Sequence, residues 1–391
     1  MKTSLVSSAL VGILVGFGSS ITIVIAGAQA VGANPAQLAS WVSAICLGTG
    51  VASIVLSLGH RLPMITAWST PGAALIAGTA AAGVPSYSME AAVGAFLLTS
   101  LLVLLSAKGR PLAALIARIP SAIASAMLAG VLIGFSVAVF DAATMDPVLV
   151  LPLVGVFLVV RLFSPTWAVI AVLVAGVAWA VVLGKTEPYE ASGSLAAFAM
   201  IVPVFEPGAI LGLGVPLYLV SMASQNLPGF AVLRASGYAP PTRSALAVTG
   251  LMSLLTAPLC AHTTTMSSIT ASLCTGPDTH LDPARRWIAG VFYGAGFLVM
   301  AVVGVAVVAG FATLPPGVIV TVAGLALLGP LMNALGAALT PEPTRFVAVL
   351  TITATASGLS IFGIGSAFWW LVLGLVVVGL DELIRRRTDL E

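Results

Sequence analysis

Long apolar runs separated by short stretches of Pro, Gly and charged residues make up almost the whole sequence. Seven runs precede a more polar stretch, KTEPYEASGS at 185–194, and seven follow it. Most have about 20 residues or more, the length an α-helix needs to cross the hydrocarbon core of a bilayer. They lie at about 5–31, 35–59, 62–82, 86–106, 111–141, 147–162, 165–184, 207–233, 241–259, 260–276, 284–310, 315–338, 344–362 and 365–384. The pattern predicts an all-α polytopic membrane protein with about 14 transmembrane segments.

Composition excludes most other classes of protein. Of the 391 residues, 59% are hydrophobic and only 7% are charged, and the mean hydropathy is +1.15. A soluble protein has about 25% charged residues, a nucleic-acid binder needs a basic face, and an outer-membrane barrel alternates apolar and polar positions. We therefore expect the lipid bilayer as the surroundings and no nucleic-acid partner.

The two halves of the chain match each other at a nearly constant offset of 195 or 196 positions. Gln29 falls on Gln225, Pro63 on Pro258, and the pair Asp146-Pro147 on Glu342-Pro343. An odd number of segments in each half makes the second half enter the membrane from the opposite side, which gives an inverted repeat. We expect a first repeat at 1–184, a linker at 185–206 and a second repeat at 207–391.

The basic residues test this threading. With the N-terminus in the cytoplasm, 14 of the 15 Lys and Arg residues fall at cytoplasmic ends of the segments, and only Lys185 falls outside. This bias is the one that the positive-inside rule predicts. Both termini are therefore expected in the cytoplasm.

The third apolar run, HRLPMITAWSTPGAALIAG at 60–78, is a poor continuous helix. Pro63 and Pro71 interrupt it, together with β-branched Ile65 and Thr66. We expect an extended stretch at about 62–68 and then a half-helix, with Thr70 as its N-cap and Pro71 in its first turn. Backbone groups left free at such a break need protein, water or ligand as partners, so broken helices in membranes line cavities.

The tenth run repeats this design in the stretch APLCAHTTTMSSITAS at 257–272. Pro258 corresponds to Pro63, Thr264-Thr265 corresponds to Ser69-Thr70, and Met266-Ser267-Ser268 is expected to open a second half-helix. Two half-helix N-termini facing each other would bind an anion without Lys or Arg. The candidate substrate contacts are Ser69, Thr70, Thr263, Thr264 and Thr265. Alternatively, these hydroxyls only pack helices or bond to the preceding turn.

Amides and one histidine lie near the same region. Gln29, Gln225 and Asn226 either hold helices together or hydrogen-bond a carboxylate ligand. His262 is the one ionisable side chain placed near the midplane, which makes it the candidate proton carrier. The alternative is a neutral, structural histidine.

Catalytic and metal-binding patterns are missing from the sequence. There is no HExxH motif, and Cys46, Cys260 and Cys274 fall inside apolar runs without CxxC spacing. We expect no cofactor and no metal, and we do not expect an enzyme.

Three stretches carry a family resemblance: ITAWSTPGAALIAG, PLYLVSMASQNLPGFAVLRASGY at 216–238, and APLCAHTTTMSSITAS. With them the sequence resembles the bacterial benzoate:proton symporters of the BenE type, which are grouped with uracil-permease and bicarbonate or sulfate transporters. The resemblance implies 14 segments in two inverted repeats, a core domain at about 1–106 and 207–311, and a gate domain at about 111–184 and 314–384. It also implies a substrate site between the broken third and tenth segments and elevator-type transport.

One departure from these relatives concerns charge. Uracil-type relatives have acidic residues in the eighth and tenth segments, whereas this sequence has Gln225, Asn226 and Thr263 to Thr265 there. The change agrees with a carboxylate substrate, which an acidic residue would repel. Trp68 either stacks on an aromatic ring of the substrate or fills space between helices.

The sequence thus predicts a secondary active transporter of a bacterial inner membrane that imports benzoate or a related aromatic carboxylate together with a proton. The alternatives are a transporter of the same fold with a nucleobase or an inorganic anion as its substrate, and a passive channel. A homodimer is left open.

Overall fold

The computed structural model describes residues 5–18, 20–81, 87–108, 121–188, 198–267 and 269–357, with five further positions between 369 and 377. Most of the predicted run at 365–384 lies outside these residues, and so do the basic residues Lys2, Arg110, Arg118 and Arg385 to Arg387.

Helices form most of the first half. Its elements are α1 (Leu5–Gly18), α2 (Ile21–Ala30), α3 (Pro35–His60), β1 (Thr66–Trp68), α4 (Thr70–Ala81), α5 (Met89–Lys108), α7 (Ser121–Met145), α8 (Pro147–Phe163) and α9 (Pro165–Val182). The first predicted run is one apolar stretch of 26 residues, Leu5–Ala30, but its helix is interrupted between α1 and α2.

The second half contains α10 (Pro207–Ala209), α11 (Val215–Ser221), α12 (Leu227–Ala235), α13 (Thr242–Thr256), β2 (Thr264–Met266), α14 (Ile269–Thr275), α15 (Trp287–Val302), α16 (Gly304–Ala312), α17 (Pro316–Leu339) and α18 (Arg345–Ala356). In the described part of the chain, six helices are long and apolar enough to cross a membrane, or seven if the bent pair of α15 and α16 is one span. The protein is therefore a mostly helical membrane protein, and the count of 14 segments stays a prediction.

Two π-helical turns interrupt the helix that runs from Pro207 to Ala235. One spans Ile210–Gly214 and the other Met222–Asn226. Each is followed within two residues by a proline, Pro216 or Pro228. Proline lacks an N–H and its ring clashes with the carbonyl four residues earlier, so a wider turn before it relieves the clash. Such bulges are frequent at functional sites.

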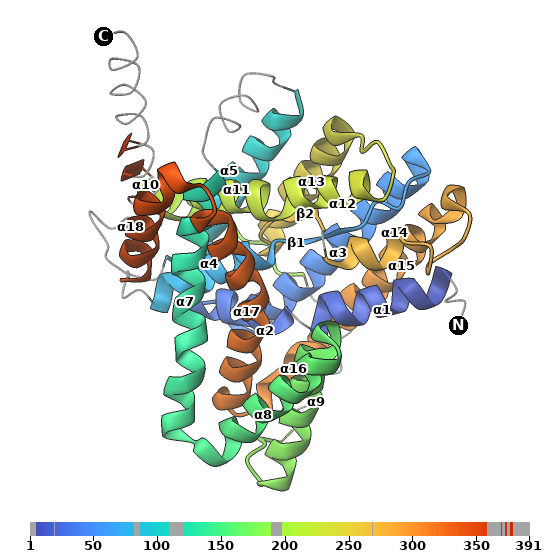
Figure 1. The fold of residues 1–391 in the computed structure, drawn as a ribbon. Helices are drawn as coiled ribbons and strands as arrows, with labels where there is room; N and C mark the ends of the chain where they lie inside the picture. The colour runs from blue at the N-terminus through green and yellow to red at the C-terminus, as the bar shows by residue number, and fades with distance from the viewer. Residues whose placement is uncertain are drawn as a thin grey trace.

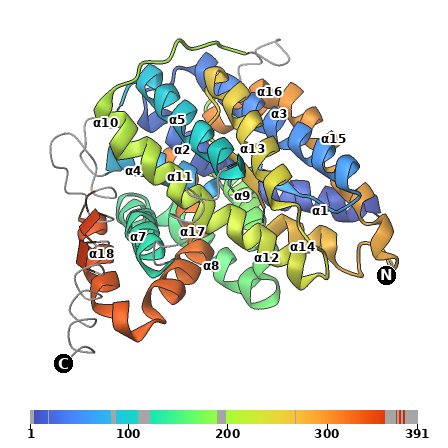
Figure 2. The same ribbon diagram turned by 90° about the horizontal axis from the view of Figure 1, so that it is seen from above.

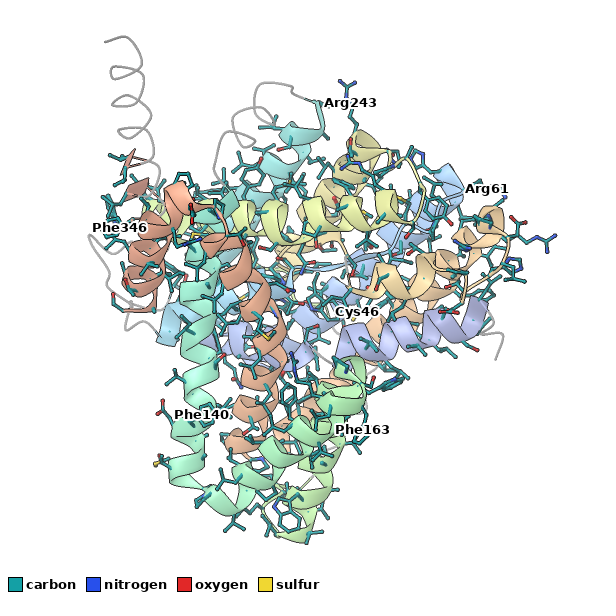
Figure 3. The ribbon with its side chains drawn as sticks, in the orientation of Figure 1. Cys46, Arg61, Phe140, Phe163, Arg243 and Phe346 are labelled. Atoms are coloured by element: carbon teal, nitrogen blue, oxygen red, sulfur yellow. The ribbon has the colours of Figure 1, made fainter. Side chains whose placement is uncertain are left out.

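The helices pack into two regions. Around β1 and β2 lie α1 to α5 and α11 to α15, while α7 and α17 run side by side toward α8 and α9 (Figures 1 and 2). The ends of α7, α8, α9 and α17 enclose a second hydrophobic cluster, which includes Leu149, Val172 and Val318. Phe140 and Phe163 point outward from this lower part (Figure 3) and are 59% and 85% exposed. An outward apolar surface of this kind suits contact with lipid.

At the centre of the upper region, β1 and β2 pair antiparallel. Thr66 lies opposite Met266, Ala67 opposite Thr265, and Trp68 opposite Thr264. The predicted interruptions of both apolar runs are thereby confirmed. Two details were wrong. Met266 belongs to β2, so α14 begins only at Ile269. Ser69 rather than Thr70 is the N-cap of α4, because its Oγ accepts the Gly72 N–H at 3.0 Å and its carbonyl accepts the Ala73 N–H.

Several of the arginines gather at one end of the molecule. The His60 ring bonds the Ser244 hydroxyl at 2.8 Å, which places the end of α3 beside the start of α13. The Arg61 guanidinium lies 4.6 Å from the ring centre of Trp287, the first residue of α15. These contacts bring together the following basic residues: Arg61, Arg243, Arg285 and Arg286. Lys185 lies elsewhere, hydrogen-bonded to Asp146 at the start of α8.

Candidate functional site

A partly open cavity of about 50 Å³ lies beside the paired strands. It is lined by residues of α1, the α1–α2 junction, β1, α4, the second π-helical turn, α14 and α15: Val15, Gly16, Ser20, Ala67, Trp68, Thr70, Gln225, Ser267, Ile269, Thr270, Tyr293 and Phe297. An apolar cavity of about 150 Å³ in another protein holds benzene. A substrate with an aromatic ring therefore fits here only after the lining side chains move apart.

Aromatic rings line part of the cavity. Trp68 is 2% exposed and meets Phe17 and Phe297 edge-on, with ring centres 5.9 and 5.6 Å apart. Its indole N–H donates to the Ser20 hydroxyl at 3.1 Å, and that hydroxyl donates to the Gly16 carbonyl at 2.7 Å. The ring of Trp68 is thus held in one orientation by the junction between α1 and α2.

Uncharged polar groups also line the cavity. Among the described residues, the Gln225 amide and the Thr70 hydroxyl line the cavity without a hydrogen-bond partner. In the same lining, the Ser267 and Thr270 hydroxyls are 2.6 Å apart, and Thr270 Oγ1 lies 3.4 Å from the Tyr293 hydroxyl. The lining therefore offers both hydrogen-bond donors and hydrogen-bond acceptors.

The helices of both interrupted segments begin at this cavity. Thr70 is the first residue of α4, and Ile269 and Thr270 are the first two residues of α14. The antiparallel pairing of β1 with β2 brings the first residues of α4 and α14 to the same cavity. Of the predicted site residues, the structure brings Trp68, Thr70 and Gln225 to the cavity.

Asn226 does not line the cavity, although it follows Gln225 directly. It is fully buried. Its Oδ1 accepts the Met266 N–H at 2.9 Å, and its Nδ2 donates to the Ser221 carbonyl at 3.3 Å. The amide supports the backbone of β2 at the break before α14.

Ser69 and the other predicted threonines are also hydrogen-bonded within the protein, Thr264 through its backbone. The Thr263 and Ser221 hydroxyls are 3.0 Å apart, Thr264 donates its N–H to the Ser253 hydroxyl at 2.8 Å, and Thr265 Oγ1 donates to the Ala67 carbonyl at 3.2 Å. Ser69 caps α4 and donates its N–H to the Thr263 carbonyl. We call β1, β2 and the side chains bonded to them the strand crossing: Ser69, Asn226, Ser253, His262, Thr263, Thr264 and Thr265.

His262 is fully buried in the strand crossing, with both ring nitrogens in use. Its Nδ1 accepts the Trp41 indole N–H at 3.0 Å, and its Nε2 lies 3.1 Å from the Ser69 carbonyl. Because indole only donates and a carbonyl only accepts, these partners define a neutral imidazole with its proton on Nε2. The ring connects α3 to the start of α4.

Gln29 lies away from the site, as an exposed residue near the end of α2. Sequence reasoning missed Ser20, Ser267, Thr270, Tyr293 and Phe297. The signal for four of them was a polar side chain within an apolar run, such as Tyr293 between Gly290 and Gly294, and Phe297 gave no signal. The described residues include no group of three or more His, Cys, Asp or Glu side chains that could hold a metal.

Comparison with known proteins supports a transport role. The family described as benzoate membrane transport protein (BenE) matches residues 1–380. The chain is 35% identical over 375 residues to the inner membrane protein YdcO of Escherichia coli, covering 96% of this chain and 95% of YdcO. It is 33% identical over 364 residues to a benzoate membrane transport protein of Acinetobacter baylyi, covering 93% of this chain and 91% of that protein.

Solved structures show the same fold at low sequence identity. The transmembrane domain of a cyanobacterial bicarbonate transporter, BicA, has a TM-score of 0.60 at 13% identity, over 96% of this chain and 99% of that one. The murine anion transporter Solute Carrier 26 family member A9 has a TM-score of 0.61 at 11% identity, over 97% of this chain and 68% of that one. The protein is a membrane transporter and not an enzyme, and the chain belongs to the benzoate membrane transport protein (BenE) family.

Proposed function

We propose that the protein imports benzoate or a related aromatic carboxylate together with a proton across a bacterial inner membrane. The observation that carries the proposal is the composition of the cavity. Its lining combines aromatic rings with uncharged hydrogen-bonding groups, and the helices of both interrupted segments begin there. An aromatic ring with a carboxyl group is complementary to such a lining.

Thr70, Gln225, Ser267 and Thr270 are the candidates for binding the carboxyl group, and Trp68 and Phe297 are the candidates for contacting the ring. We assign to Ser69, Asn226 and Thr263 to Thr265 the role of holding the two interrupted segments together. Gln29, which is exposed, has no part in this arrangement.

Alternating access is proposed to move the site between the two sides of the membrane. In this scheme the core domain, at about 1–106 and 207–311, carries the cavity past a gate domain at about 111–184 and 314–384. The small cavity supports a contracted state, because a substrate with an aromatic ring requires the lining residues to separate. The end that collects Arg61, Arg243, Arg285 and Arg286 is proposed to face the cytoplasm, together with both termini.

The driving force follows from charge balance. One proton moving with one monovalent anion carries no net charge, so a pH gradient supplies about 1.4 kcal/mol per unit. A second proton would add about 2.3 kcal/mol per 100 mV of membrane potential. We propose a stoichiometry of one proton per carboxylate.

Uptake into proteoliposomes tests the proposal. With the potential held at zero by valinomycin and potassium, an imposed pH gradient should drive accumulation of labelled benzoate, and removal of the gradient should abolish it. Uptake with strong voltage dependence would overturn the stoichiometry. In a parallel thermal-shift series, benzoate should stabilise the protein more than uracil or sulfate does; stabilisation by uracil or sulfate alone would overturn the proposed substrate.

A further inference from the structure

We infer that the proton that accompanies the substrate travels on the substrate's own carboxyl group, so that the occluded cavity holds a neutral aromatic carboxylic acid. This inference rests on the proposed function and deepens it, because it locates the proton. Three observations support it: the described residues that line the cavity are uncharged, the N–H groups of Gly72 and Ala73 at the start of α4 are already hydrogen-bonded, and the surrounding elements provide no base.

No described residue that lines the cavity carries a formal charge. An isolated carboxylate that leaves water for uncharged surroundings loses a large solvation energy, and the usual outcome is that the group takes up a proton. A neutral carboxylic acid has one O–H donor and a carbonyl acceptor. The Gln225 amide, with a donor and an acceptor of its own, is complementary to such a group.

The start of α4 has little capacity left to neutralise an anion. Pro71 has no N–H, and the N–H groups of Gly72 and Ala73 are already bonded to the Ser69 hydroxyl and carbonyl. Of the first four residues of α4, only Thr70 has an N–H without a bond to Ser69. The helix that follows β2 has only seven residues, which makes its dipole short. Hydrogen bonds to a carboxyl group are available here, but a compensating positive charge is not.

The elements packed around the cavity provide no base that can accept the proton. Within α1, α2, β1, α4, the second π-helical turn and α14–α15, the titratable side chains are Cys274 and Tyr293. A neutral thiol or phenol holds its own proton near pH 7 and has no site for a second one. In the described part of the chain no Asp or Glu side chain is buried.

His262, in the strand crossing, is the alternative acceptor, and its bonding opposes that role. Protonation turns both ring nitrogens into donors. Its Nδ1 would then point a hydrogen at the Trp41 N–H, 3.0 Å away. The ring would have to break this bond and turn, although Nε2 is bonded to the Ser69 carbonyl. Its surroundings thus favour the neutral form, and His262 acts as a positioning residue.

Proton transfer in this scheme needs no other reactant. A benzoate anion enters the open cavity from outside, and one of its carboxylate oxygens takes a proton from the external solution. The site closes on the neutral acid, opens inward and releases it, and the O–H bond breaks in the cytoplasm to return one proton and one carboxylate. One proton and one negative charge cross together.

Three probes of similar shape test the inference in purified full-length protein: benzoate, benzamide and benzenesulfonate. Proton uptake on binding is measured near pH 7 by titration calorimetry in buffers of different ionisation enthalpy. Benzoate should take up about one proton and benzamide none. Benzenesulfonate, which stays ionised, should bind on the order of 100-fold more weakly than benzoate or not at all, because its charge stays unpaired. Benzenesulfonate that binds as tightly as benzoate and takes up a proton would overturn the inference.

Two variants separate a proton on His262 from one on the substrate. His262→Gln should retain uptake of one proton per bound benzoate; benzoate binding without proton uptake would overturn the inference. Trp41→Phe removes the donor to Nδ1 while leaving the imidazole in place, and it covers the case in which His262→Gln does not fold. Its pH midpoint for benzoate binding should match that of the unaltered protein, and a clear rise would assign the proton to His262. If benzoate bound neither the unaltered protein nor either variant, that result would instead refute the proposed function.

Discussion

The strand crossing and the cavity beside it are built from the same kinds of polar residue, yet they use them differently. In the strand crossing, Asn226 and Ser69 are fully buried and hydrogen-bonded within the protein. Thr70, which follows Ser69, and Gln225, which precedes Asn226, instead line the cavity, and their side chains have no described hydrogen-bond partner. Burial with satisfied bonds gives a rigid support, and accessible polar groups give a binding surface. Adjacent positions can therefore have opposite roles.

Replacing Asn226 should produce the largest effect on folding. Asn226→Leu leaves the buried Met266 N–H without its acceptor, which costs about 1–3 kcal/mol of unfolding free energy. The matched change Gln225→Leu should alter the free energy of unfolding by less than about 0.5 kcal/mol. It should weaken benzoate binding by about two- to tenfold, because one hydrogen bond to the substrate is lost. Thermal unfolding in detergent and a binding titration measure the two effects.

The contrast between the two amides would fail if both variants lost stability equally, or if Asn226→Leu kept full stability and lost only binding. The latter outcome would make Asn226 the substrate contact and Gln225 the bystander.

Ser69 and Thr70 allow the same comparison at the start of α4. Ser69→Ala removes the N-cap, and such a change typically costs about 1 kcal/mol of stability. Thr70→Val keeps the N-cap and the shape of the side chain, so we expect normal unfolding and a weaker affinity for benzoate. Thermal unfolding and binding should again separate the two variants, and normal stability in Ser69→Ala would show that Gly72 finds another acceptor.

Thr265→Val should have a smaller effect on binding than either cavity variant. Sequence reasoning made Thr265 a candidate anion contact, but its hydroxyl donates to the Ala67 carbonyl at 3.2 Å. The variant loses this one bond between the strands, so we expect a modest loss of stability and less than about a twofold change in benzoate affinity. A tenfold loss of affinity with unchanged unfolding would instead place Thr265 in contact with the substrate.

The interruptions themselves were visible in the sequence, because proline acts locally. Pro63, Pro71 and Pro258 each remove an N–H, and β-branched neighbours favour extended backbone. Both runs therefore contain a strand where a continuous helix would otherwise cross. The bonding within these segments was not visible, since Ser69 and Thr70 are equally good N-cap residues by type. The choice between them is made by geometry at the crossing.

Partners that come from distant parts of the chain could not be read from the sequence. Trp41 reaches His262 across 221 positions, and Asn226 reaches Met266 across 40. Tyr293 and Phe297 reach the cavity because α15 packs closely on α3. A Cβ atom at Gly294 would lie 2.6 Å from the Gly50 carbonyl, so the approach depends on glycine. Whether an amide is buried and satisfied or open to a cavity is set by such contacts.

The exposed ion pair between Lys185 and Asp146 should give the smallest effect, and it serves as a reference outside both central regions. The hydrogen bond from the Lys185 ammonium lowers the pKa of the Asp146 carboxyl. A lowered folded-state pKa adds stability at a pH above the unfolded value, near 4, and this stability is lost as the pH falls through the folded value. Asp146→Asn keeps an N-cap acceptor for α8 and removes the charge.

We therefore expect Asp146→Asn to unfold at a slightly lower temperature than the unaltered protein at pH 7, with the difference shrinking below about pH 4 and in high salt. Lys185→Met should behave in the same way. Because both side chains contact water, each shift should be smaller than that of Asn226→Leu. A shift in unfolding temperature as large as that of Asn226→Leu would contradict this expectation. So would a shift that persists at low pH, where the Asp146 carboxyl of the unaltered protein is protonated.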